Sequence, residues 1–305
     1  MSTLADWLQL ESEVSAALDA REPVVALESA LITHGFSPPA NLRIARQMEA
    51  AVRAEGAVPA TIGVLDGQPH VGLSSECMTR LALPATPLSK ISLRDLPVVA
   101  AKGDSGGTTV AATMHLAHQV GIQLLATGGI GGVHRAHPED VSTDLTALGS
   151  IPITVVCSGA KAILDLPRTL EVLETKGVPV VGYGTEYFPA FYSRSSGLEA
   201  DVALDRPGDV VRLARMRTQL GLSSAILVCV PVPDASALAE TEAEAFIAQA
   251  VEEAEQAGVG GKDLTPYLLS RIVELTAGEA QRANEALLVN NARVAARIAR
   301  AFTAP

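Results

Sequence analysis

The chain has 305 residues, of which 48% are hydrophobic and 19% are charged. This composition excludes a disordered chain, a collagen-like fibre and a small disulfide-rich scaffold. Aromatic residues make up only 3% of the chain and the formal net charge is -11, so binding to nucleic acid or to an anionic membrane is not expected. A local cationic pocket for one phosphate is still compatible with this charge.

The cysteines and the N-terminal segment indicate a cellular compartment. Cys77, Cys157 and Cys229 are odd in number and form no CxxC pair, so we expect buried thiols in a reducing cytoplasm rather than disulfides or structural zinc. Residues 1–22 carry several acidic side chains and lack the basic start and apolar centre of a signal peptide. No apolar run approaches the roughly 18 residues of a membrane-spanning helix, so we predict a cytoplasmic protein without a membrane segment.

Short β-rich runs alternate with helical patterns along the chain. The predicted strands are Pro23–Ile32, Ala60–Leu65, Val98–Ala101, Ile122–Thr127, Ile153–Cys157, Val178–Gly182 and Ala225–Val230. The predicted helices are Asn41–Glu55, Thr108–Val120, Lys161–Lys176, Pro207–Leu220 and Ser236–Ala257. This alternation predicts an α/β fold with a largely parallel sheet, and Asp66-Gly67 between two β-like runs predicts one antiparallel hairpin.

The pattern becomes entirely helical after Pro233. In the last segment, Glu279–Phe302, the residues Leu287, Val294 and Ile298 fall on one helical face, which predicts a helical C-terminal tail packed on the sheet. No repeat, charge block or Pro/Ser-rich linker interrupts the chain. We therefore expect residues 1–305 to form a single domain.

Residues Gly103–Gly107 spell GDSGG, the string around the nucleophile of chymotrypsin-like proteases. That chemistry needs a His base and a buried Asp in two β-barrels, whereas here the string leads into the helical pattern of an α/β chain. We instead interpret it as a Gly-rich turn before a helix N-terminus, where free N–H groups and the helix dipole favour an anion.

A second Gly-rich turn, Thr127–Arg135, follows a predicted strand and matches neither the dinucleotide fingerprint nor a Walker A loop. Its four glycines within five positions favour close approach of the backbone to a ligand, although a tight connection alone is the alternative. Asp140 and Asp144 follow, with hydroxyl residues between them. Such hard oxygen groups suit Mg²⁺ or Mn²⁺, and a helix cap or a solvated loop is the alternative.

Two ionisable residues stand in apolar surroundings. Lys161 follows a predicted strand among small and apolar residues; partial desolvation there favours the neutral amine that attacks a carbonyl carbon, whereas a surface lysine is the alternative. Glu28 lies inside the apolar strand, where burial would raise the pKa of its carboxyl and let it act as an acid near neutrality.

Asparagines interrupt the apolar face of the last predicted helix at positions 284, 290 and 291. For Asn284, contact with a ligand and capping of a core polar group both remain open. For Asn290 and Asn291 we favour the structural role.

Many blocks of sequence together resemble one family. They are Ala26–Ser29 with His34-Gly35, Val58–Ile62, Lys90–Ser92, Arg94–Pro97, Gly107–Met114, Thr127–Arg135, Ser142–Leu145, Ser158–Asp165, Thr169–Thr175, Phe188–Phe191, Gly261–Pro266, Asn284 and Asn290-Asn291. On these blocks, in this order over nearly the whole chain, the sequence resembles the pseudouridine-5'-phosphate glycosidases, a family that includes proteins of indigoidine gene clusters.

The resemblance implies a three-layer α/β/α fold with a mostly parallel mixed sheet, a homotrimer, and a divalent metal, usually Mn²⁺. It implies an enzyme that reversibly cleaves the C–C glycosidic bond of pseudouridine 5'-phosphate to uracil and ribose 5-phosphate. Lys161 falls on the covalent lysine, Glu28 on the proton donor and Asp140 on the metal ligand. The residues predicted to contact substrate are Lys90, Ser92, Val110, Thr127, His134, Ser142, Thr143, Asp144 and Asn284.

The chemistry of a C–C glycosidic bond agrees with this assignment. The bond has no leaving-group heteroatom to protonate, so the paired-carboxylate hydrolysis of O-glycosides is not available in its usual form. An imine between Lys161 and the ring-opened sugar would supply the required electron sink. A C-glycoside synthase that joins ribose 5-phosphate to another aromatic acceptor is the nearest alternative, and a non-catalytic sugar-phosphate sensor is a second.

Overall fold

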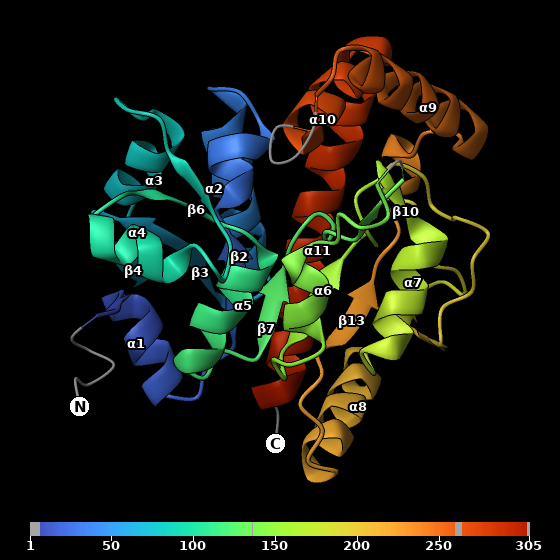
Figure 1. Cartoon of the computed structure of the whole chain (residues 1–305). Coiled ribbons are helices and arrows are strands. Elements are labelled where there is room, and N and C mark those ends of the chain that lie inside the picture. The colour runs from blue at the N-terminus through green and yellow to red at the C-terminus, as the bar shows by residue number, and fades with distance from the viewer. Residues whose placement is uncertain (1–6, 136, 260–263, 304–305) are drawn as a thin grey trace.

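The computed structural model describes residues 7–135, 137–259 and 264–303. In this part of the chain, 11 strands form one mixed sheet (Figure 1). Nine of them follow one another across the sheet in the order β1 (Gln9–Leu10), β4 (Gln68–Val71), β3 (Val58–Leu65), β2 (Val24–Glu28), β7 (Leu124–Ala126), β9 (Thr154–Cys157), β13 (Ile226–Cys229), β11 (Val180–Tyr183) and β12 (Val202–Leu204). The short strand β6 (Gly106–Thr108) pairs with β3, and β5 (Ser89–Ile91) pairs with β6.

Parallel pairing runs without a break from β3 through β2, β7, β9, β13 and β11 to β12. The strands in the middle of this series are completely buried, as expected for parallel strands with helices on both faces. Antiparallel pairs join β3 to β4 and to β6. The β3–β4 turn has positive φ at Asp66 and Gly67, which confirms the predicted hairpin.

Helices form a layer on each face of the sheet (Figure 1). One layer contains α2 (Ala40–Ala54), α8 (Pro207–Gln219) and α11 (Glu279–Thr303), and the other contains α5 (Val110–Gln119), α6 (Thr143–Leu148) and α7 (Leu166–Thr175). The predicted α/β/α fold class is thereby confirmed. The helix α11 packs along β2, β7 and β9, which confirms the predicted helical tail. Its buried face consists largely of alanine, so the helix approaches the sheet closely.

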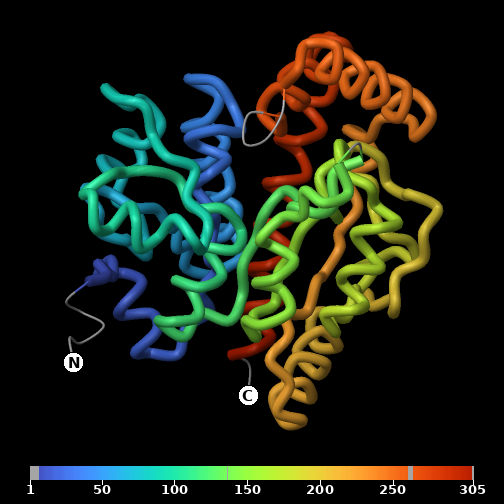
Figure 2. The backbone as a smooth tube through the Cα atoms, in the orientation of Figure 1, coloured from blue at the N-terminus to red at the C-terminus, as the bar shows by residue number. Residues whose placement is uncertain are grey.

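The remaining helices lie at the margins of the molecule. They are α1 (Ser12–Asp19), α3 (Ser75–Ala82), α4 (Leu96–Lys102), α9 (Glu240–Gln256) and α10 (Leu264–Leu275). The pair α9 and α10 packs together beside the start of α11 and projects past the end of the sheet (Figures 1 and 2).

The predicted strand Val98–Ala101 is wrong, because these residues lie in α4. The β-branched pair suggested a strand, but the boundary residues favour a helix. Pro97 occupies the first turn, and Gly103 ends the helix with φ 72°, a left-handed conformation suited to glycine.

Two other predicted boundaries are also wrong. The strand predicted as Pro23–Ile32 ends at Glu28, and a π-helix, η2 (Leu31–Gly35), follows. The helix predicted from Lys161 begins only at Leu166, where Asp165 accepts a hydrogen bond from the N–H of Arg168 at 3.0 Å. Lys161 therefore lies in a loop between β9 and the short strand β10 (Leu164–Asp165), which pairs with β8 (Val133–His134).

The GDSGG string does not lead directly into a helix, because Gly106–Thr108 forms β6 before α5 begins. A Cβ atom on Gly106 would lie 2.1 Å from the Ser89 carbonyl oxygen, and one on Gly107 would lie 2.3 Å from Thr33 Oγ1. These glycines thus permit close packing of strands and the segment after β2. The predicted Gly-rich turn before a helix is therefore wrong for Gly106 and Gly107, which lie in a strand.

Cys157 and Cys229 are buried free thiols on adjacent strands and Cys77 is half-buried. Within the described residues, no helix has the length and apolar character required to cross a membrane.

Candidate active site

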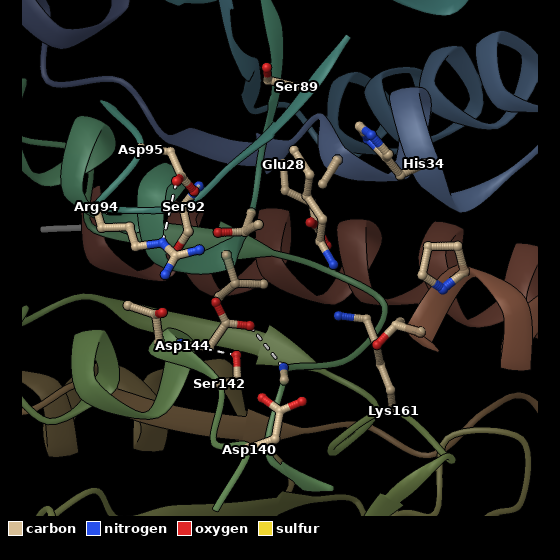
Figure 3. A pocket seen from close by; sticks show the side chains of 18 of the residues that line it. Glu28, His34, Ser89, Ser92, Arg94, Asp95, Asp140, Ser142, Asp144 and Lys161 are labelled. Atoms are coloured by element: carbon tan, nitrogen blue, oxygen red, sulfur yellow. Dashed lines mark hydrogen bonds and ion pairs between the residues drawn. The ribbon is translucent and has the colours of Figure 1, made fainter. Parts of the chain in front are cut away.

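The carboxyl ends of three neighbouring strands create the candidate site. The parallel strands β2, β7 and β9 end next to one another. Strand β2 ends at Glu28, β7 leads into the turn from Thr127, and β9 leads into the loop that carries Lys161. Ligands of open α/β sheets bind at this end of the strands. A cavity of about 820 Å³ lies here, and Glu28 and Lys161 both line it (Figure 3).

Glu28 is the last residue of β2 and is 7% exposed. The Thr127 hydroxyl donates a hydrogen bond to its Oε1. Burial raises the pKa of the Glu28 carboxyl, while the nearby charge of Lys161 and the Thr127 hydrogen bond oppose this rise. The carboxyl therefore remains protonated to a higher pH than a free glutamate does.

The loop after β9 holds Lys161 next to the turn after β7. The Lys161 N–H donates to the Ile130 carbonyl at 3.0 Å, and the Ile130 N–H donates to the Gly159 carbonyl at 3.1 Å. Gly159 has φ +80°, and a Cβ atom there would lie 2.3 Å from the Pro189 carbonyl oxygen, so this bend requires glycine. The side chain of Lys161 extends into the cavity toward the region of Glu28 (Figure 3).

Further cationic groups line the same cavity. Lys90, in β5, lines the cavity and is exposed to the solvent within it. Partial burial by the cavity wall lowers the pKa of its ammonium group, and the nearby charge of Lys161 lowers it further. Burial also lowers the pKa of the His34 imidazole, in the π-helix, and the nearby charge of Lys90 lowers it further. The cavity thus contains cationic side chains beside several carboxyl groups.

The start of α5 forms another wall. Thr109 precedes the helix, and its hydroxyl is buried without a hydrogen-bond partner among the described residues. Thr109 and Val110 line the cavity. A helix N-terminus with an unsatisfied hydroxyl is suited to bind an anion.

Asp144 has a structural role beside this helix. Its Oδ1 accepts from the Ala111 N–H at 2.9 Å and its Oδ2 accepts from the Gly131 N–H at 2.8 Å. The side chain of Ser142 caps α6 by accepting from the Asp144 N–H at 3.2 Å. The helix-cap alternative therefore describes Ser142 and Asp144 well, although both also line the cavity with Thr143.

The glycines of the second turn serve protein packing as well as the cavity. A Cβ atom on Gly129 would lie 2.7 Å from the Phe191 ring, and one on Gly132 would lie 2.4 Å from Thr169 Oγ1. Gly128 packs against α11 in the same manner. Of the four glycines, Gly131 and Gly132 line the cavity, so the expected close approach to a ligand applies at most to this pair.

Most of the residues predicted from the sequence come together. The predicted residues that line the cavity are Glu28, Lys90, Ser92, Val110, His134, Asp140, Ser142, Thr143, Asp144 and Lys161. Thr127 and Asn284 do not line it. Thr127 instead contacts Glu28, and Asn284 lies against Gly128, where a Cβ atom would be 3.4 Å from Asn284 Oδ1.

Several lining residues were not predicted as site residues. His34 and Arg94 lie within blocks that carried the family resemblance, which was the available signal. Arg94 pairs with Asp95 at 3.4 Å (Figure 3). Thr265 and Pro266 reach the cavity from α10, whereas residues 261–263 of the same block lie outside the described residues.

The predicted metal ligand Asp140 faces the cavity beside His134. Its Oδ2 lies 3.8 Å from His134 Nε2, and its side chain is 46% exposed. Burial lowers the pKa of His134, while Asp140 opposes this shift, so the neutral imidazole that binds metals is favoured. Within the described residues no group of three or more His, Cys, Asp or Glu is placed to hold a metal. A carboxylate and an imidazole fit a hydrated Mn²⁺ that takes its other ligands from water or substrate.

Comparison with known proteins gives a consistent family. The family model for Indigoidine synthase A like protein matches residues 13–301. A protein of Rhodospirillum centenum (strain ATCC 51521 / SW) named pseudouridine-5'-phosphate glycosidase is 58% identical over 299 residues, covering 97% of this chain and 93% of that protein. One of the same name from Paracoccus denitrificans (strain Pd 1222) is 52% identical over 298 residues, covering 97% and 98%.

Solved structures agree in fold. The prealnumycin C-glycosynthase AlnA, solved in complex with ribulose 5-phosphate, is 38% identical with a TM-score of 0.90, and 97% of each chain is covered. An indigoidine synthase A (IdgA)-like protein from Thermotoga maritima MSB8 is 33% identical with a TM-score of 0.89, again with 97% of each chain covered. These findings confirm the resemblance stated from the sequence and the expectation of an enzyme. The chain belongs to the family of Indigoidine synthase A like proteins.

Proposed function

We propose that this protein is a pseudouridine-5'-phosphate glycosidase, which reversibly cleaves the C–C glycosidic bond of its substrate to uracil and ribose 5-phosphate. The name of its relatives supports this function. The observation that carries the proposal is that a lysine, Lys161, and a buried carboxyl with a raised pKa, Glu28, line one cavity at the carboxyl ends of the strands.

In the first proposed step, the neutral amine of Lys161 attacks C1' of the ribose. A bond forms between Nζ and C1', the bond between C1' and O4' breaks, and the amine proton moves to O4'. The sugar is then open and bound to the enzyme. This step requires the amine of Lys161 in its uncharged, nucleophilic form.

In the second step, Glu28 donates its proton to C5 of uracil. The bond between C1' and C5 breaks, the nitrogen lone pair forms an imine with C1', and uracil leaves. Water then adds to C1', the carbon–nitrogen bond breaks and ribose 5-phosphate is released, while a proton returns to Glu28. The sum is one water consumed for each bond cleaved. A raised pKa suits Glu28 to proton donation.

The phosphate has a suitable position in this cavity. Lys90 supplies a positive charge. Thr109 supplies a hydroxyl that has no hydrogen-bond partner among the described residues, and Val110 begins a helix. Lys90 also lies close enough to Lys161 for their charges to interact, so a phosphate there would lie within reach of the sugar that Lys161 attacks. Ser92, Ser142 and Thr143 supply hydroxyls for the ribose.

Asp140 and His134 are the residues that would hold the divalent metal, for which we propose Mn²⁺. Such an ion polarises oxygen atoms of bound water or substrate. We also propose a homotrimer in the cytoplasm, with a small-molecule substrate and no nucleic-acid or membrane partner.

A C-glycoside synthase is the second candidate. It is supported by the 38% identity and TM-score of 0.90 to AlnA, whose structure contains ribulose 5-phosphate. Such an enzyme would use the same lysine and sugar phosphate in the joining direction.

The test is incubation with pseudouridine 5'-phosphate and Mn²⁺, with uracil measured by chromatography. We expect the wild-type protein to release uracil and the Lys161→Ala variant to release none. Absence of uracil from the folded wild-type protein would contradict the glycosidase, and the synthase would then be tested with ribose 5-phosphate and aromatic acceptors.

A further inference from the structure

Asn291 is a buried polar residue in the apolar helix α11. It is 0% exposed, and the other buried residues of Glu279–Thr303 are Ala, Leu, Val or Ile. A buried amide is costly unless it is hydrogen-bonded, so the partners of this side chain indicate what it does.

Those partners lie at the ends of two adjacent strands. The Asn291 Nδ2 donates to the Thr127 carbonyl at 2.9 Å, just after β7, and to Ser158 Oγ at 3.1 Å, just after β9. The Ser158 hydroxyl also lies 3.3 Å from Asn291 Oδ1. Because a carbonyl oxygen only accepts, the amide must present its NH₂ group to Thr127.

Each strand end adjoins one of the proposed catalytic groups, the end of β7 through a side-chain hydrogen bond and the end of β9 along the chain. The Thr127 hydroxyl donates to Glu28. Ser158 stands three residues before Lys161, and its N–H donates to the Gly128 carbonyl at 2.8 Å. One side chain on α11 therefore contacts both of the backbone-paired segments that adjoin the proton donor and the nucleophile.

We propose that Asn291 is a positioning residue for the reaction: its side chain adds to the backbone hydrogen bonds between the ends of β7 and β9, and it fixes the two segments that adjoin Glu28 and Lys161. This inference rests on the proposed function. The bridge is the set of hydrogen bonds from Asn291 to Thr127 and Ser158. We expect its loss to lower the rate of the chemical step more than the affinity for substrate, because the positions of Lys90 and the start of α5 do not depend on it.

The sharpest variant is Asn291→Asp, which keeps the shape of the side chain and removes its donor. A carboxylate oxygen would then face the Thr127 carbonyl. We expect kcat for uracil release to fall on the order of 10²-fold, as for other misplacements of reacting groups by about 1 Å, while KM changes much less.

Two further variants separate positioning from loss of stability. Val294→Ala removes buried methyl groups from the same helix without touching the bridge and should lower the melting temperature while leaving kcat unchanged. Thr127→Val removes the hydroxyl that contacts Glu28 but keeps the carbonyl that Asn291 contacts. In the double variant of Thr127→Val with Asn291→Asp, the losses in kcat should be less than multiplicative, because both act through Glu28.

The outcomes distinguish this inference from the function on which it rests. If the wild-type protein releases no uracil, the proposed function fails, and a crystal structure of Asn291→Asp still decides the inference: we expect the contact between Thr127 Oγ1 and Glu28 to be broken. A preserved contact would overturn it. If the wild-type protein is active, a folded Asn291→Asp variant with wild-type kcat, or an equal loss of kcat in Val294→Ala, would overturn it.

Discussion

Glu28 combines a buried carboxyl with two groups that stabilise its ionised form. Burial has the largest effect on its pKa and raises it, while Lys161 and the Thr127 hydroxyl lower it. The net rise in pKa favours the protonated carboxyl of Glu28. The proposed reaction requires the neighbouring amine of Lys161 in its unprotonated form. Two ionisable groups with opposite requirements in one site are typical of acid–base pairs in enzymes.

Replacement of Glu28 by Gln preserves its size and removes its transferable proton. We expect kcat for uracil release to fall by about 10²- to 10⁴-fold, the usual contribution of general acid–base catalysis. In the wild-type protein, kcat should fall as the pH rises through the raised pKa of Glu28, because the proton donor is then lost. The same alkaline limb in the residual activity of Glu28→Gln would show that another group is responsible.

The same carboxyl has a consequence for stability. Its folded-state pKa lies above the ordinary value of 4.5, so the protonated form is favoured by folding. Relative to Glu28→Gln, the wild-type protein should keep its full stability below pH 4.5 and lose part of it as the pH rises through the folded-state pKa. Urea unfolding of both proteins across this range measures the difference. A difference in the free energy of unfolding that is constant with pH would contradict the raised pKa.

At the residue scale, the sequence pattern itself identified Glu28 and Lys161, whereas Lys90 came from the family resemblance and His34 and Arg94 were not predicted as site residues. Glu28 and Lys161 stand out because charged residues are rare in apolar strands and at their ends. Thr127 and Asn284 were predicted to contact substrate; Thr127 donates to Glu28, Asn284 lies beside Gly128, and neither lines the cavity. The sequence does not distinguish a residue that touches substrate from one a few ångströms behind it, because both occupy the same segments.

At the scale of elements, Asp144 connects three of them. It belongs to α6, and its carboxylate accepts from the first turn of α5 and from the turn after β7. The position of the α5 N-terminus relative to the Gly-rich turn therefore depends on one side chain.

Asp144→Asn replaces one acceptor oxygen by an NH₂ group that must face a backbone N–H. We expect the free energy of unfolding to fall by about 1–3 kcal/mol, the cost of a buried donor without a partner. The matched control is Asp209→Asn in α8, whose ion pair with Arg212 at 3.0 Å lies at the surface and should matter by about 0–1 kcal/mol. Urea unfolding checks both variants, and equal losses would exclude the bridging role of Asp144.

The order of the elements was predictable because buried parallel strands alternate with amphipathic helices, but some element types and boundaries were not. Val98 and Val99 favour a strand locally, yet Pro97 and Gly103 bound a helix there. Gly106 and Gly107 have no side chains that would signal a strand, and β6 exists because it pairs with β3 and β5. Such pairings depend on distant segments and leave no local pattern.

At the scale of the whole molecule, the topology explains why residues so distant in sequence share one cavity. Parallel strands β2, β7 and β9 all point in one direction, so the segments after them meet at one edge, while α11 covers the sheet behind them. The net charge of -11 does not prevent binding of a phosphate, because Lys90 and Lys161 line this cavity.

Metal dependence tests the proposed role of Asp140, which lines this cavity. After treatment with EDTA we expect activity to be lost and to return with Mn²⁺, and we expect Asp140→Ala to require more Mn²⁺ and to bind it more weakly by electron paramagnetic resonance. Glu139→Ala removes a neighbouring exposed carboxylate that does not line the cavity and should behave as wild type. Full activity of metal-free wild type and of Asp140→Ala would refute the role of Asp140.

The central claim is that Lys161 bonds covalently to the sugar, and borohydride trapping with ribose 5-phosphate tests it most directly. Reduction of the imine leaves a stable secondary amine, which peptide mass spectrometry locates. We expect one ribose phosphate adduct per chain, on the peptide that contains Lys161, and none in Lys161→Ala. An active wild-type protein that forms no adduct on Lys161, together with an active Lys161→Ala variant, would contradict the account.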